Sequence, residues 1–171
     1  LMPLLVMPTY EHTLLDQTYA AAVRRQIEYG KLRRLPWGIS ESGYNSVDAH
    51  LHYQYRAFGV PGLGLKRGLA EDIVIAPYAS ALALMVAPEE ACRNLQRLAA
   101  DGLDGRYGLY EAIDYTPSRL PRGLSSVVVM GEAERSRLAR TVGCLPPNRF
   151  WADWSRNVAS SDSPFATSRT P

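Results

Sequence analysis

The chain has 171 residues, of which 46% are hydrophobic, and this is enough to build the core of one ordinary domain. Its 19 basic and 17 acidic residues are spread along the chain and give a formal net charge of +2; without the clustered positive charge of a nucleic-acid-binding surface, we expect no nucleic-acid partner. The cysteines, Cys92 and Cys144, show neither metal-ligand spacing nor a disulfide framework, so a reducing compartment fits and we expect a cytoplasmic location.

The N-terminal part predicts a helix after an irregular start. Residues 1–8 are apolar, but prolines interrupt them, they lack the basic region of a signal peptide, and they fall far short of the about 20 residues of a membrane span. Because the chain begins with Leu, we expect an internal cut in a longer sequence. From Glu11 to Gly30, apolar residues recur in steps of three and four, which predicts an amphipathic helix that ends at Gly30.

The middle of the chain alternates between irregular and helical segments. Glycines and prolines break the stretch from Leu35 to Gly68, and residues 105–115 are again rich in glycine and tyrosine. Between these stretches, helices that begin near Pro77 and Pro88 predict an antiparallel hairpin, since proline suits the first helical position. The alternation favours a helical barrel whose loops carry the function.

The first candidate for chemistry is the stretch from Pro36 to Asn45, where the carboxylate of Glu41 lies between small residues and is flanked by Trp37 and Tyr44. Sugar rings stack on aromatic side chains, and their hydroxyl groups bond to Glu, Ser and Asn, so this mixture suits a glycan. The alternative is a capped turn around a packed tryptophan.

The second candidate is the tyrosine-rich stretch 107–115, which contains Glu111 and Asp114. Cleavage of a glycosidic bond needs one protonated and one ionised carboxyl group, about 5 to 9.5 Å apart. Glu41 and Glu111 form a candidate pair, but they are far apart in the sequence and only the fold can bring them together. The alternative is two unrelated surface acids.

Two further motifs do not support a functional site of their own. The glycine-rich run 59–68 lacks the lysine directly after its second glycine that a phosphate-binding loop requires, so Lys66 and Arg67 are expected in solvent, in an ion pair or at a substrate. His50 and His52 would share one face of an extended segment, but no third metal ligand is apparent, and we expect polar or substrate contacts rather than a metal. No catalytic triad stands out.

Five runs of residues together resemble the glycoamylase-like domain of bacterial cyclic β-1,2-glucan synthases, and the resemblance extends from Leu1 to about Ser126. The runs are Met2 to Tyr10, Leu14 to Tyr19, Pro36 to Ser42, Tyr53 to Gly64 and Tyr110 to Pro117. The resemblance implies an all-α fold, here a partial (α/α)₆ toroid with aromatic-rich connections. It also implies cleavage or transfer of β-1,2-glucan chains, without a cofactor.

In this family the acidic motif residues correspond to Glu41 and Glu111, with Asp114 as a further candidate; the assignment of acid and nucleophile stays open, as do hydrolysis against transglycosylation and retention against inversion. The substrate-binding candidates are Trp37, Tyr44, Asn45, Tyr53, Gln54, Tyr55, Lys66, Arg67, Tyr110 and Tyr115. The resemblance further implies a parent protein associated with the inner membrane, with this domain on the cytoplasmic side beside glucosyltransferase and phosphorylase-like domains.

The chain departs from the family pattern after Ser126. Where members carry a Met-Ala-His-His-Gln-Gly-Met run, residues 130–134 read Met-Gly-Glu-Ala-Glu. We therefore predict a glycoamylase-like fragment over residues 1–128 and a divergent tail over 129–171, with a frameshift or truncation as its cause, helical potential only over 133–139 and otherwise disorder. Alone, such a partial ring is expected to be inactive, and a non-catalytic glycan-binding or scaffold role is the alternative function.

Overall fold

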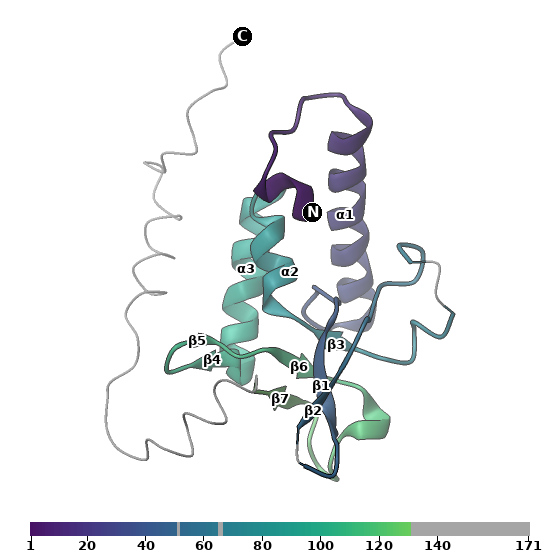
Figure 1. Ribbon diagram of the computed structural model, residues 1–171, viewed down its shortest axis with the longest axis vertical. Helices are drawn as coiled ribbons and strands as arrows, with labels where there is room; N and C mark the ends of the chain where they lie inside the picture. The colour runs from purple at the N-terminus through teal and green to yellow at the C-terminus, as the bar shows by residue number, and fades with distance from the viewer. Residues whose placement is uncertain (51, 65–66, 131–171) are drawn as a thin grey trace.

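The computed structural model describes residues 1–50, 52–64 and 67–130, and within them the helices occupy one half of the molecule and small sheets the other (Figure 1). The α-helices are α1 (Leu14–Arg33), α2 (Pro77–Ala83) and α3 (Pro88–Leu98), and shorter helical turns are η1 (Met2–Leu5), η2 (Ala99–Leu103) and η3 (Pro117–Arg119). The strands are β1 (Ser42–Val47), β2 (Tyr53–Arg56), β3 (Val74–Ile75), β4 (Asp104–Gly105), β5 (Gly108–Leu109), β6 (Ala112–Asp114) and β7 (Val127–Val129). The predictions for the tail beyond residue 130 lie outside the described residues.

The prediction of an all-α toroid is wrong for the part of the chain that the structure describes. Three α-helices stand beside strands that form a β1-β2 sheet, a β3-β6-β7 sheet and a β4-β5 sheet. The connections interpreted as irregular loops contain β1, β2, β5 and β6. Most of the strands are two or three residues long, too short for the alternation of polar and apolar residues that announces a strand in a sequence.

Helix α1 confirms the first predicted helix, although it extends further than expected. The Thr13 side chain caps its start by accepting a hydrogen bond from the Asp16 N–H over 3.3 Å. The helix continues past Gly30 and ends at Arg34, which adopts the left-handed conformation at φ 59°. Gly30 instead allows a close approach, because a Cβ there would lie 2.8 Å from the Cβ of Trp37.

The predicted hairpin of α2 and α3 is also confirmed. Each helix begins with a proline, Pro77 and Pro88, which lacks the N–H that would go unpaired at this position. The hairpin packs on α1 through a small cluster of buried residues, Val23, Trp37, Ala83 and Ala91. No helix within the described ranges has the length and apolar character needed to cross a membrane.

The main core lies around the antiparallel β3-β6-β7 sheet, in which β3 and β6 are fully buried and β7 is partly buried. Ile75 of β3 pairs with Ile113 of β6 on one side, and an isolated bridge pairs it with Ile39 on its other side. The hairpin of β1 and β2 packs against this sheet, with Gly43 opposite Tyr55. The stretches that precede β1 and β6 therefore meet near the centre of the molecule, beneath the helices.

Candidate functional site

A hollow of about 690 Å³ lies between α1, α2 and the start of the β1-β2 hairpin. Its lining includes the aromatic side chains Trp37, Tyr55, Phe58 and Tyr78 and the polar side chains Gln26, Ser40 and Glu41. We call this the aromatic hollow. Its size and its mixture of apolar surface with a few polar groups are typical of small-molecule sites in proteins.

Glu41 is exposed and lines the aromatic hollow directly before β1. The Tyr78 hydroxyl, from the first turn of α2, donates a hydrogen bond to the backbone carbonyl of Glu41 over 3.1 Å and contacts the Ser40 hydroxyl. Tyr78 was missed in the sequence analysis. Its place directly after Pro77, at the start of a predicted helix, was the signal that could have identified it.

Glu111 lies close to the segment that carries Glu41. The N–H of Gly43 donates to Glu111 Oε1 over 3.4 Å. A Cβ at Gly43 would make only an ordinary van der Waals contact with the Cγ of Glu111, 3.5 Å away, so the approach does not depend on the glycine. Burial raises the pKa of the Tyr55 hydroxyl, and the charges of Glu41, Tyr78 and Glu111 raise it further, so both glutamates act on the same side chain. Tyr55 lines the aromatic hollow, whereas Glu111 is half-buried and is not among its lining residues.

Asp114 has a different environment from the two glutamates. Its side chain is fully buried and forms an ion pair with Arg119, with Nε and Oδ2 2.7 Å apart. It also accepts the N–H groups of Asn45 over 3.0 Å and Thr116 over 2.9 Å. Arg119 also pairs with Asp72. We call Asp72, Asp114, Thr116 and Arg119 the arginine network.

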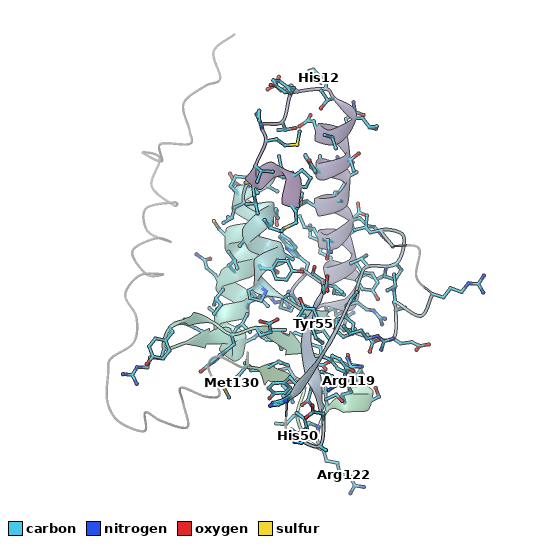
Figure 2. All side chains as sticks on the ribbon, viewed as in Figure 1. His12, His50, Tyr55, Arg119, Arg122 and Met130 are labelled. Carbon is cyan, nitrogen blue, oxygen red and sulfur yellow. The ribbon has the colours of Figure 1, made fainter. Side chains whose placement is uncertain are left out.

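Arg119, which pairs with both aspartates of the arginine network, was not singled out in the sequence analysis. Burial opposes the charge of Arg119, but its hydrogen bonds and its attraction to Asp114 and Asp72 outweigh burial and raise its pKa. The guanidinium carbon lies 5.0 Å from the ring centroid of Tyr44. Figure 2 labels Arg119 below Tyr55, at the end of the molecule away from the start of α1. These contacts give Arg119 and Asp114 a structural environment with no opening to the hollow.

The other predicted binding residues fall into three groups. Trp37 and Tyr55 line the aromatic hollow, although Trp37 is only 8% exposed and mainly packs in the core. Tyr44 and Asn45 contact the arginine network, where the Asn45 side chain donates to the Arg119 carbonyl over 2.7 Å.

The third group is not assigned to the aromatic hollow or to the arginine network. Tyr110 packs against Gly105, while the buried Tyr115 donates to Asp101 over 2.7 Å and lines a second hollow of about 490 Å³. Tyr53 and Gln54 belong to β2 but are not among the residues that line the aromatic hollow. Arg67 is exposed, and Lys66 lies outside the described residues.

His50 and His52 lie in the loop between β1 and β2. Asp48 accepts the backbone N–H groups of His50 over 2.8 Å and of His52 over 2.9 Å, and these bonds, together with the nearby His52 ring, lower the pKa of the Asp48 carboxyl group. His50 lies at the opposite end of the molecule from His12 (Figure 2). Within residues 1–50, 52–64 and 67–130, no three His, Cys, Asp or Glu side chains are arranged to hold a metal ion.

Comparisons with known proteins establish the family. Residues 5–134 match the model of the Glycoamylase family, which is described as "Putative glucoamylase". Because the match covers more than half of the sequence, the chain belongs to this family.

The chain is also similar to a named synthase. It is 50% identical over 129 residues, which is 75% of the chain, to the cyclic beta-(1,2)-glucan synthase NdvB of Rhizobium meliloti (strain 1021). The matched residues span 5% of that synthase. The resemblance to the glycoamylase-like domain of glucan synthases is therefore confirmed, and the chain is homologous to a short segment of such a protein.

Proposed function

We propose that this chain forms part of an enzyme site for β-1,2-linked glucan, in which Glu41 and Glu111 supply the paired carboxyl groups. The observation that carries the proposal is the 3.4 Å approach of Glu111 Oε1 to the N–H of Gly43, two positions after Glu41. This approach joins two acidic segments that are far apart along the chain, beside a hollow lined with aromatic rings.

The chemistry requires two carboxyl groups with different roles. One donates a proton to the glycosidic oxygen, while the other attacks the sugar carbon or activates a water molecule. A sugar hydroxyl in place of water gives transfer instead of hydrolysis. Glu41 lines the aromatic hollow directly, and Glu111 is close enough to Tyr55, another lining residue, for its charge to raise the pKa of that hydroxyl.

The aromatic side chains would hold the glucose rings. Tyr55 and Tyr78 are 61% and 42% exposed, so their rings are accessible for stacking, and Trp37 adds an edge of its indole. Asp114, Tyr44 and Asn45 support the site through the arginine network and do not reach the sugar in this proposal. In a parent synthase the segment would work on the cytoplasmic side of the inner membrane beside glucosyltransferase and phosphorylase-like domains.

The test separates binding from turnover. Binding of linear β-1,2-gluco-oligosaccharides is measured by calorimetry on the 171-residue chain, and turnover is measured in a chimera in which the matched segment of this chain replaces that of the Rhizobium meliloti synthase. We expect Glu41→Gln and Glu111→Gln each to lower turnover by at least about 100-fold, since each removes a proton-transfer or nucleophilic group. Glucan binding should change less than about threefold.

Glu89→Gln is the matched control, because the Glu89 side chain is 86% exposed on α3. Its turnover should equal that of the unaltered chimera. An active chimera that tolerates both substitutions would remove these glutamates from the mechanism. A chain that binds glucan while its chimera is inactive would instead support the non-catalytic binding role, which is favoured by the absence of Glu111 from the lining of the hollow.

A further inference from the structure

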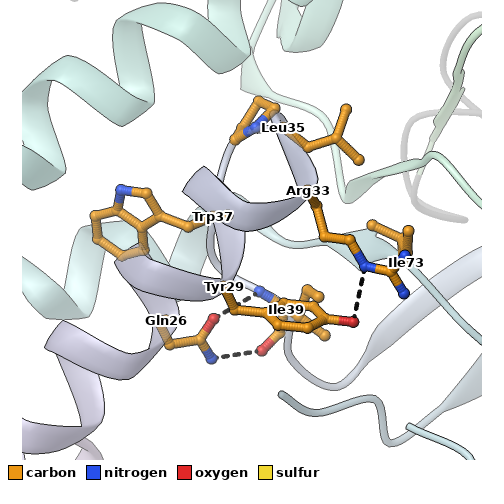
Figure 3. A pocket seen from close by; sticks show the side chains of 9 residues that line it. Gln26, Tyr29, Arg33, Leu35, Trp37, Ile39 and Ile73 are labelled. Atoms are coloured by element: carbon orange, nitrogen blue, oxygen red, sulfur yellow. Dashed lines mark hydrogen bonds between the residues drawn. The ribbon is translucent and has the colours of Figure 1, made fainter. Parts of the chain in front are cut away.

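The backbone that leads into Glu41 is held by the side-chain amide of Gln26. Gln26 Nε2 donates to the carbonyl of Ile39 over 2.9 Å, and the N–H of Ile39 donates to Gln26 Oε1 over 3.1 Å (Figure 3). One carboxamide on α1 therefore satisfies both backbone polar groups of a single residue. Such pairing normally comes from a neighbouring strand, and here a helix side chain supplies it.

A second side-chain amide, that of Asn94 on α3, holds the same segment. The N–H of Trp37 donates to Asn94 Oδ1 over 3.0 Å, and Asn94 Nδ2 donates to the carbonyl of Trp37 over 2.7 Å. Asn94 Nδ2 also donates to Ser80 Oγ over 2.8 Å, and the side chain is 5% exposed. We call Gln26 and Asn94 the amide clamp. It joins α1 and α3 to alternate residues of the stretch that ends in Glu41.

The residue between the two clamped positions also fits closely. Gly38 has φ 114°, a conformation that other residues rarely adopt, and a Cβ there would lie 3.2 Å from Ser80 Oγ. Its carbonyl accepts the N–H of Ala76 over 3.0 Å. The backbone from Trp37 to Ile39 is therefore bonded on both sides, and Glu41 begins only two positions later.

We propose that Gln26 is a positioning residue for Glu41, with Asn94 as the second anchor, so that the amide clamp fixes where the Glu41 carboxylate enters the aromatic hollow. This inference rests on the proposed function of Glu41. Gln26 also lines the hollow, but its amide oxygen and nitrogen are both engaged by Ile39. Its contribution is therefore to hold the backbone, and misplacement of a reacting group by about 1 Å can cost about 100-fold in rate.

The experiment replaces Gln26 while leaving its volume nearly unchanged. Gln26→Met removes both bonds to Ile39, and Gln17→Met is the matched control, because Gln17 is exposed on the same helix. We expect Gln26→Met to lower the kcat of the chimera by about 10- to 100-fold, while glucan binding to the 171-residue chain changes less than about twofold. Amide hydrogen exchange at Ile39 should accelerate in Gln26→Met and stay unchanged in Gln17→Met.

A second variant keeps half of the contact. Gln26→Glu can still accept the Ile39 N–H, but it can donate to the Ile39 carbonyl only when its carboxyl group is protonated. Its kcat relative to the unaltered chimera should therefore rise as the pH falls. A loss of kcat caused by general damage to the structure would not produce this dependence of relative kcat on pH.

The outcomes separate this inference from the proposed function. If Glu41→Gln abolishes turnover while Gln26→Met leaves kcat unchanged, the positioning role is wrong. Equal losses of glucan binding and kcat in Gln26→Met would also overturn it, since they indicate general damage to the site. Turnover that survives Glu41→Gln refutes the proposed function itself, and the positioning role fails with it, whatever the exchange rate at Ile39.

Discussion

Two carboxylates three positions apart, Glu111 and Asp114, lie in opposite environments. Glu111 is half-buried and makes one long contact with the Gly43 N–H, whereas Asp114 is fully buried and pairs with Arg119. The same kind of side chain therefore has different surroundings within one short segment. An acid beside a hollow can react with a ligand, while an acid inside the arginine network stabilises the fold.

The difference arises from partners that are distant in the sequence. The Glu111 contact comes from β1, and the partners of Asp114 come from η3, from β1 and from the residues next to it. A buried carboxylate is stable only when such partners replace the water that it loses. Removing the charge should therefore affect stability at Asp114 and reactivity at Glu111.

The largest expected effect on stability comes from Asp114→Asn. This change removes the charge of the buried Asp114 and leaves the half-buried Arg119 with a weaker partner, and we expect the free energy of unfolding to fall by about 3 kcal/mol. Urea unfolding of the 171-residue chain measures it. Asp104→Asn, at an exposed position, should change the free energy by less than about 0.5 kcal/mol and serves as the control. A loss at Asp114 as small as that at Asp104 would contradict the comparison.

An intermediate effect is expected at Tyr115, which directly follows Asp114. Burial and the hydrogen bond to Asp101 raise the pKa of the Tyr115 hydroxyl above its value in the unfolded chain, which is about 10. Below about pH 10 the hydroxyl is protonated in both states, and its contribution to stability is complete. Above that pH the unfolded chain loses the proton first. The free energy of unfolding then falls by up to about 1.4 kcal/mol per pH unit.

The measurement is urea unfolding between pH 8 and the alkaline limit of the fold, with Tyr115→Phe beside the unaltered chain. The free energy of unfolding of Tyr115→Phe should fall less steeply with rising pH than that of the unaltered chain. Tyr107→Phe, at an exposed tyrosine, should retain all of it. Identical slopes in Tyr115→Phe and the unaltered chain would show that the phenol is not protected in the folded state.

The smallest expected effect on stability is that of Glu111→Gln. Because Glu111 is half-buried and Gln can still accept this long bond from the Gly43 N–H, the free energy of unfolding should change by less than about 0.5 kcal/mol. Urea unfolding checks this beside Asp114→Asn. A loss close to that of Asp114→Asn would place Glu111 among the stabilising residues and weaken its proposed role in turnover.

The helices were predictable from local signals. Prolines at the first helical position identify α2 and α3, and apolar spacing identifies α1. The end of α1 was wrong because Gly30 serves a close approach to Trp37, a contact between residues outside the helical pattern. The short strands escaped prediction because most have only two or three residues, and because the pairing of β3 with β6 joins segments far apart along the chain.

The candidate site was predictable only in part. The two acidic segments stood out by their aromatic neighbours, but the approach of Glu111 to Gly43 depends on β1 packing against β6, which no local pattern reveals. Trp37 is only 8% exposed, in agreement with the interpretation as a packed tryptophan, although it also lines the hollow. The roles of Glu41 and Glu111 in turnover stay predictions.

The two-residue strand β3 has a consequence for the spacing of the acids. Ile75 pairs on one edge with Ile39, two positions before Glu41, and on the other with Ile113, two positions after Glu111. Both acidic stretches thus share a single buried anchor that carries no reactive group. A change of shape at Ile75 would displace both acidic stretches together, so the relative position of Glu41 and Glu111 depends on a buried aliphatic side chain.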